Sequence, residues 1–340
     1  MSDPKPVMSS SIIVKYNKSS DTAAITDSCE EFTYEDYASG QSDAITLQLD
    51  NTDKKWFKGY FPVKGDYVAC TLTTKNWIEK PTNGKLYCGR FDIDEISFSG
   101  QPSIVNIEGV AVPKRQGISV AQRNKTWKKT TLKTILSDMA KRAGMPLVFD
   151  ATDQKIEDES QSGQTDLEFA YGLCESYGLA LKVFNNKLVC YDPTRYEKKN
   201  TVTTIEYGKF IGSYSCHANV TEVYDGVKVQ YTLPKKEKAQ TYKYIIPGHK
   251  GSRLLFVSDK CTSLKEAEIK GKAALRKQLR QSKTMSLSLL GNTKYKSACN
   301  IKIKGWGKMD GKYFIDSVTH NKTRGKYTCD LEIHRVVTNF

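Results

Sequence analysis

The feature that most constrains the fold is a pair of alternating segments within residues 84–112. Phe91, Ile93 and Ile96 carry apolar side chains with acidic residues interleaved. A Ser-Gly-Gln-Pro sequence then turns the chain, and residues 104–112 return with apolar side chains at alternate positions. A period of two is typical of a strand that buries one face. The sequence therefore predicts a long β-hairpin with one side in a core.

A second hairpin of the same design occurs near the C-terminus. Residues 311–318 alternate, a polar turn follows at 321–325, and residues 326–336 return. The sequence Ile-Asp-Glu-Ile at 93–96 aligns with Ile-Asp-Ser-Val at 315–318, at an offset of 222 residues. Two hairpins of one design predict a duplicated β-domain.

The remaining patterns predict the domain organisation. The 340 residues are enough for two or three domains with separate cores. Residues 11–115 and 201–340 consist mostly of short alternating segments separated by turn sequences. We expect a mainly β (β+α) fold in which these segments form two similar tube-like β-barrel domains. Residues 116–200 are expected to form a small α+β insert between them, and residues 1–10 a polar N-terminal arm.

Helical spacing replaces alternation within the insert. Apolar residues from Leu132 to Ala143 lie on one face of a predicted helix, which Gly144 ends. A capping-box sequence, Thr165 to Glu168, starts a second helix. The acidic stretch 150–159 is expected to be a loop. Its order of carboxylates differs from that of an EF-hand, so calcium binding is not predicted.

A third helix is predicted at about 263–281 within the second barrel domain. Small residues on one face would let it lie close against a sheet, and its other face is basic. That face is either solvated or in contact with an acidic neighbouring subunit. The acidic, aromatic segment 27–37 is expected to be an extended segment at an edge or interface. The candidate subunit or partner interface residues are Lys265, Lys272, Arg276, Arg280, Phe32, Tyr34 and Tyr37.

The net charge of +14 suits binding to nucleic acid, an anionic membrane or an acidic protein. The lysines are spread along the chain, however, and no nucleic-acid-binding motif accompanies them. Sequence-specific nucleic acid binding is therefore not expected, although a basic DNA-binding module remains an alternative. The chain has no apolar run of the ~20 residues that a membrane span needs. It also has no secretory signal pattern, so we expect synthesis in the cytoplasm.

Residues that could carry chemistry are scattered. The four histidines are far apart in the sequence, and the nine cysteines contain no Cys-x-x-Cys pair. Asp92 and Asp94 could act as paired carboxylates in glycoside hydrolysis. Asp316 repeats the second of them at the duplicated position, which favours a turn or register element over an active site. We predict no catalytic residue, metal or cofactor; a peptidoglycan-degrading enzyme remains the alternative.

An ordered series of sequence blocks resembles one known family. The blocks are residues 42–47 with Trp56 and Gly65-Asp66, residues 89–96, Trp127 with Thr131-Leu132, residues 162–178, and residues 314–318. In this order, and over roughly residues 8 to 337, they resemble the late control protein D family. Proteins of that family are the baseplate hubs of contractile-tailed phages and of related particles such as R-type bacteriocins (tailocins).

The resemblance implies a structural protein rather than an enzyme. A hub of this kind is a homotrimer that adapts the sixfold tail tube to the threefold central spike and nucleates assembly. Its implied partners are other copies of itself, the tail tube protein, the central spike protein and other baseplate proteins, with the tape measure protein as a further candidate. The protein would then be a component of a virion or of a released tail particle. The sequence leaves open which of these two particles it belongs to.

Overall fold

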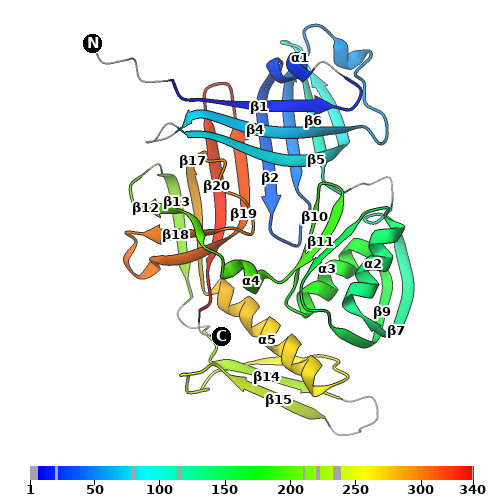
Figure 1. Ribbon diagram of the computed structural model, residues 1–340, viewed down its shortest axis with the longest axis vertical. Helices are drawn as coiled ribbons and strands as arrows, with labels where there is room; N and C mark the ends of the chain where they lie inside the picture. The colour runs from blue at the N-terminus through cyan, green and yellow to red at the C-terminus, as the bar shows by residue number, and fades with distance from the viewer. Residues whose placement is uncertain are drawn as a thin grey trace.

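A twelve-stranded sheet runs through the computed structural model, and it consists of two groups of six strands (Figure 1). The first β-unit has the hydrogen-bonded order β1-β4-β5-β6-β3-β2. Its strands are β1 (Ser9–Tyr16), β2 (Cys29–Tyr37), β3 (Ala44–Asp50), β4 (Tyr67–Trp77), β5 (Thr82–Ser99) and β6 (Ile104–Val110). The second β-unit has the order β12-β18-β19-β20-β17-β13. Its strands are β12 (Thr201–Glu206), β13 (Ile211–Ala218), β17 (Lys283–Leu290), β18 (Asn300–Lys304), β19 (Gly311–Lys322) and β20 (Tyr327–Arg335).

The structure describes residues 7–19, 22–77, 82–112, 117–209, 211–219, 223–232, 239–338 and 340. The mainly β fold predicted from the sequence is confirmed. Within the predicted arm 1–10, residues 1–6 lie outside the described residues, and β1 already begins at Ser9. A short helix that the sequence did not suggest, α1 (Thr22–Asp27), follows β1.

The predicted duplication is confirmed at the level of single β-bulges. The pairing of β5 with β6 shifts register between Ile93 and Glu95, and the pairing of β19 with β20 shifts between Ile315 and Ser317. The two bulges are 222 residues apart, as the sequence alignment required. A bulge inserts one unpaired residue and bends its strand. Asp94 and Asp316 are the inserted residues, which supports their interpretation as register elements.

The two similar β-units share one sheet and one core, and among the described residues no closed barrel is found where tube-like β-barrel domains were expected. Strand β18 covers only the first part of β19, so the edge of β19 from Ser317 to Lys322 is open to another partner. Strand β2 takes that place antiparallel, from Tyr37 opposite Ser317 to Phe32 opposite Lys322. We call this pairing the internal junction. Among the described residues, neither unit closes into a barrel of its own.

The insert packs two helices between a sheet and a ribbon. Its elements are β7 (Gln122–Thr131), α2 (Leu132–Arg142), β8 (Leu147–Asp150), β9 (Lys155–Thr165), α3 (Asp166–Ser176), β10 (Ala180–Phe184) and β11 (Lys187–Tyr191). Both predicted helices are confirmed, as is the capping box of Thr165 and Glu168. The expected loop 150–159 is wrong in its second half, because β9 begins at Lys155 and pairs with β7. This polar ribbon buries few side chains, so its alternation is weak in the sequence.

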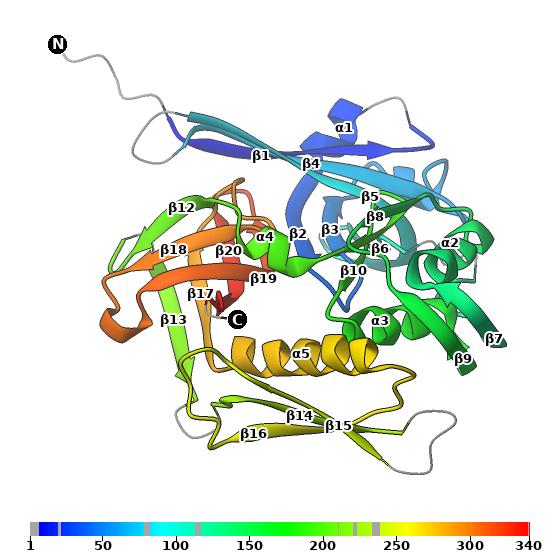
Figure 2. The same cartoon turned by 60° about the horizontal axis from the view of Figure 1, so that its bottom comes forward.

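Two strands expected in the second barrel, near residues 227–231 and 243–246, belong instead to a separate small sheet with a third strand that the sequence did not suggest. The three strands are β14 (Gly226–Tyr231), β15 (Gln240–Ile245) and β16 (Leu254–Ser258). The helix α5 (Leu264–Gln281) lies across one face of this sheet and extends from β17 towards α3 (Figure 2). A β-carbon added at Gly271 would stand 2.5 Å from a methyl group of Val229, so the predicted close approach of a small residue is confirmed.

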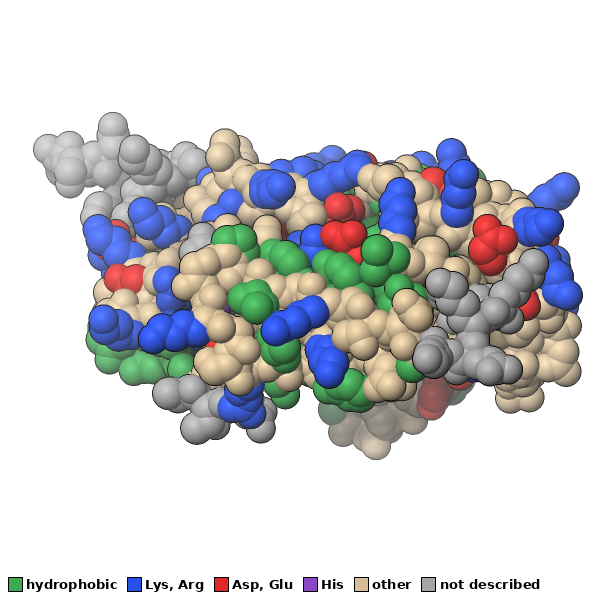
Figure 3. Space-filling view, turned by 90° about the horizontal axis from the view of Figure 1, so that it is seen from below, with side chains coloured by type: hydrophobic (Ala, Val, Ile, Leu, Met, Phe, Trp, Pro, Cys, Tyr) green, Lys and Arg blue, Asp and Glu red, His purple; other side chains and the backbone are tan. Residues whose placement is uncertain are grey.

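The end of the molecule formed by this small sheet shows hydrophobic side chains among lysines and arginines (Figure 3). Phe256 and Ile245 are exposed on the small sheet, and Lys228 and Lys243 are exposed beside them. A five-residue helix, α4 (Pro193–Glu197), links the insert to the second β-unit. No helix in the described part of the chain is both long and apolar enough to cross a bilayer.

Candidate functional site

Strand β2 holds three of the predicted interface residues, and the structure places it at the internal junction. Phe32 and Tyr34 point into the shared core, with 1% and 2% of their surfaces exposed. The Tyr34 ring stacks on that of His320 across the junction, with centroids 5.8 Å apart. The Tyr37 hydroxyl donates to the carboxylate of Glu35 at 3.0 Å. The segment therefore lies at an interface inside the chain, and Phe32 and Tyr34 offer no surface to a second molecule.

A buried charged cluster fastens the junction to the insert. Lys182 of β10 forms ion pairs with Asp36 of β2 and with Asp43, at 3.0 Å from the latter. It also donates to the Tyr37 carbonyl at 2.8 Å and to the Ser297 hydroxyl at 3.1 Å. Ser297 in turn donates its backbone amide to Asp36 at 2.8 Å. One lysine thus joins the first β-unit, the insert and the loop before β18.

The pKa shifts in this cluster follow from burial and from its charge balance. Asp43 is fully buried, and burial raises its pKa to about 7, although Lys182 opposes the rise. Burial alone would lower the pKa of Lys182, but the two carboxylates outweigh it and raise that pKa. The two buried carboxylates favour the charged form of Lys182, so the lysine keeps its proton firmly. The cluster therefore holds the first β-unit and the insert together through charge-assisted contacts.

A second buried cluster joins α4, α5 and β20. Glu197 accepts from Arg280 at 2.8 Å, and His334 lies 3.4 Å from the same oxygen. His334 also contacts the carboxylate of Asp316, the bulge residue of β19, at 2.8 Å. Burial opposes the charge on His334, but Asp316 and Glu197 outweigh it and raise the pKa of the imidazole. The bulge therefore aims a carboxylate at the neighbouring strand.

The predicted basic face of α5 mostly contacts its own chain. Arg280 pairs with Glu197 as described, and Lys272 pairs with Glu268 at 2.7 Å. The Arg276 guanidinium lies 4.1 Å from the centre of the Phe340 ring. Lys265 is exposed. Of the four predicted basic residues, Lys265 is thus the one whose side chain stands fully at the surface, and its contact with an acidic partner stays a prediction.

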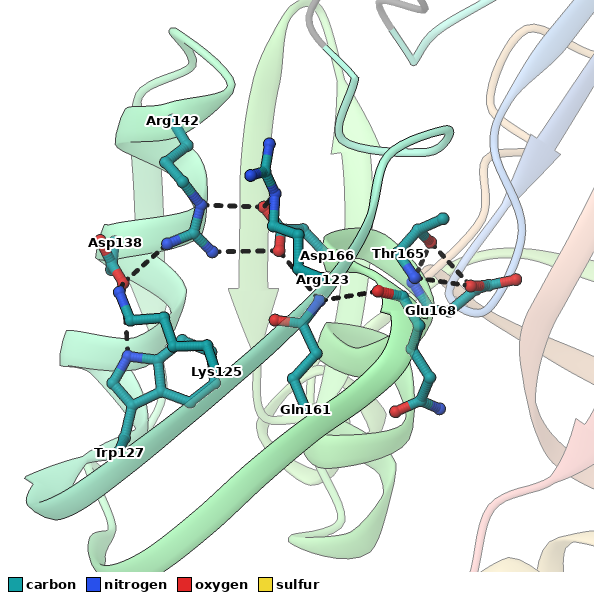
Figure 4. A network of polar contacts seen from close by, with 10 residues as sticks. Arg123, Lys125, Trp127, Asp138, Arg142, Gln161, Thr165, Asp166 and Glu168 are labelled. Carbon is teal, nitrogen blue, oxygen red and sulfur yellow. Dashed lines mark hydrogen bonds and ion pairs between the residues drawn. The ribbon is translucent and has the colours of Figure 1, made fainter.

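A network of polar contacts stabilises the insert (Figure 4). Asp166 at the start of α3 is 2% exposed and accepts two hydrogen bonds from Arg142, at 3.0 and 3.1 Å. Gln161 donates to Asp166 at 3.0 Å, and Arg142 also bonds Asp138 at 2.8 Å. A bidentate Arg–carboxylate pair is geometrically specific. The network fixes α2, α3 and β9 relative to one another.

The carboxylates considered for hydrolysis both belong to β5, where Asp92 is paired with β4 and with β6. Asp92 is 3.5 Å from Arg90, and Asp94 is the bulge residue already described. Asp92 and Asp94 both line a surface hollow of about 330 Å³. In the described part of the chain, no three His, Cys, Asp or Glu side chains are grouped as a metal site would require.

Two exposed strand edges were missed from the sequence. All residues of β13 from Gly212 to Ala218 are exposed, although β13 occupies the place in its unit that β2 occupies in the first. In β5, the segment Glu95–Ser99 pairs with β6 on one side, whereas β4 reaches only to Asp92 on the other. The signal that could have found both edges is the duplication itself, if it is followed through every strand of the two units and not only through the hairpins.

One curated protein is similar to part of the chain in sequence. No family model matches the chain. Over an alignment of 170 residues that covers 49% of the chain, the sequence is 27% identical to the "Probable baseplate hub protein" of Escherichia phage 186. The same alignment spans 41% of the relative's length, so the chain matches less than half of that protein.

Solved structures share the fold along nearly the whole chain. The prophage MuSo2 43 kDa tail protein of Shewanella oneidensis is 13% identical, with a TM-score of 0.66 over 96% of this chain and 98% of its own. A tail protein of Neisseria meningitidis MC58 is 11% identical, with a TM-score of 0.65 over 96% of each chain. The E. coli c3393 protein, a component of the type VI secretion system, is 10% identical, with a TM-score of 0.61 over 96% of this chain and 78% of its own. The sequence match is thus to a baseplate hub protein over about half of the chain, and the solved structures share the fold.

Proposed function

We propose that this protein is a structural baseplate hub of a contractile injection particle. In this role it assembles as a homotrimer, adapts a sixfold tail tube to a threefold central spike, and nucleates baseplate assembly. The observation that carries the proposal is the pair of six-stranded units with one strand order and the same bulge in their hairpins. Three chains would supply six similar units to a tube and threefold symmetry to a spike.

The partners follow from this role. They are other copies of the chain, the tail tube protein, the central spike protein and other baseplate proteins, with the tape measure protein as a further candidate. Cyclic symmetry would repeat one head-to-tail contact around the ring. The phage 186 relative supports the role because it is a probable baseplate hub protein, and the tail proteins support it through their fold.

Native mass measurement tests the proposal directly. The chain weighs 38.3 kDa, so a trimer of this chain should contribute about 115 kDa. The mass is measured for the purified protein alone and after mixing with candidate spike and tube proteins. A monomer or dimer inside assembled tail particles would contradict the trimeric hub. Clearing of peptidoglycan by the pure protein would instead point to the enzyme alternative.

A further inference from the structure

The two β-units correspond residue by residue at their edge strands. In β2 the pairing with β3 shifts register between Cys29 and Glu31, and in β13 the pairing with β17 shifts between Ile211 and Ser213. Phe32 of β2 is opposite Leu47, and Tyr214 of β13 is opposite Leu287. Counting from the shared bulge, each residue of β2 therefore corresponds to the residue of β13 that lies 182 positions later.

Both strands of the internal junction have a partner that their counterparts in the other β-unit lack. Strand β2 is paired on both sides, with β3 and with β19. Its counterpart β13 is paired only with β17 among the described residues. Likewise, the β19 segment Ser317–Lys322 is covered by β2, whereas its counterpart in β5, Glu95–Ser99, has no strand on that side in the described structure. Each unit thus lacks one partner that the other unit possesses.

Side chains buried at the internal junction have exposed counterparts at these two edges. Phe32 is 1% exposed, but its counterpart Tyr214 is 47% exposed. Exposed aromatic side chains also flank the β5 edge: Phe57 is 53% exposed and stacks on Phe98 with ring centroids 4.2 Å apart. The surface hollow of about 330 Å³ lies beside the same strand, at Asp92 to Ile96. An open strand edge flanked by apolar surface is suited to strand addition.

We propose that β13 of one copy of this chain pairs antiparallel with residues 95–99 of β5 in the next copy, in the register of the internal junction. This inference rests on the proposed homotrimer and specifies its contact. Transferring the register of β2 and β19 places Ala218 opposite Ile96, Cys216 opposite Phe98, and Ser215 opposite Ser99. The contact is head to tail, because the two edges are different surfaces of the chain. Repeating it around a closed ring would leave neither edge open.

Cysteine cross-linking between two single variants tests the register. At the internal junction the counterparts of Ser99 and Ser215 touch, with the Thr33 hydroxyl 3.3 Å from the Asn321 side chain. In a C216S background, S99C protein mixed with S215C protein should form a covalent dimer on oxidation. Neither variant should form one with itself, because a head-to-tail contact does not bring identical residues together. Both serines are exposed, so the substitutions should leave the fold intact.

A register control and the native mass separate the possible results. S97C carries its thiol on the same face of β5 two residues away, and it should cross-link with S215C less efficiently than S99C does. A dimer formed by S215C with itself would overturn the head-to-tail contact. If the wild-type protein is a trimer but the mixture of S99C and S215C proteins does not cross-link, the strand pairing is overturned and the hub proposal stands. A monomer both alone and in assembled particles would overturn both proposals.

Discussion

His320 lies at the internal junction as a neutral, buried group. Its Nδ1 atom is 2.8 Å from the Tyr327 hydroxyl and its Nε2 atom is 3.1 Å from the Tyr295 carbonyl. A neutral imidazole satisfies both contacts, since Nε2–H donates to the carbonyl and Nδ1 accepts from the hydroxyl. Burial lowers the pKa of His320 to about 4. The junction thus depends on a histidine that stays uncharged at neutral pH.

Replacing His320 should weaken the acid sensitivity of the fold. As pH falls from about 6.5 to about 4, the unfolded chain binds a proton at this position and the folded chain does not, so stability is lost. This group alone contributes a slope of up to about 1.4 kcal/mol per pH unit. We expect H320Q to be less stable than wild type but to lose less stability over that pH range. Urea unfolding at several pH values measures how the free energy of unfolding of each protein changes with pH. Equal pH dependence in wild type and H320Q would show that His320 is not the group responsible.

At the scale of elements, close packing explains why α5 stays on its small sheet. Gly271 faces Val229 of β14, and Ala267 and Leu275 are buried one turn on either side. A helix axis can approach a sheet closely only where no side chain intervenes. The approach matters because α5 also reaches α3 and β17, so it connects three parts of the chain.

The substitution G271A should therefore destabilise the protein, although alanine favours helices. The new methyl group would stand 2.5 Å from Val229, and overpacking of this kind typically costs about 1–3 kcal/mol. G172A is the matched control: Gly172 is in α3 with nothing within 4 Å of an added β-carbon, so it should gain about 0.5–1 kcal/mol. Thermal unfolding of both variants measures the difference. Equal shifts in Tm would show that α5 does not pack as described.

Elements with local signals were predictable from the sequence, whereas elements defined by distant pairing were not. The hairpin at 84–112 and the capping box at Thr165 depend on neighbouring residues, and both were found. The separation of β14 to β16 from the main sheet depends on which strands they pair with, which alternation does not report. The candidate site shows the same division. The sequence predicts the segment 27–37 at an edge or interface, but it does not identify the partner, β19, whose paired residues lie 280 to 290 positions later in the chain.

At the scale of the whole molecule, the continuous core should make the two β-units unfold together. Leu47 and Leu287 occupy corresponding positions, one in each unit, and both belong to the same buried cluster. Removing either side chain should cost about 2–5 kcal/mol. We expect L47A and L287A each to reduce protection of the slowest-exchanging amides in both units, as measured by native-state hydrogen exchange. Loss of protection confined to the mutated unit would show two independent folding units.

The small sheet and α5 are inserted into only one of the two β-units. They lie between the end of β13 at Ala218 and the start of β17 at Lys283, where the first β-unit has only the short connection from Tyr37 to Ala44. A ring of three such chains would have six similar walls, of which every second one carries a projection. Together with the α+β insert, which also occurs once per chain, the projections would repeat every 120° around the ring. The ring would therefore carry a threefold pattern that does not depend on whatever occupies its centre.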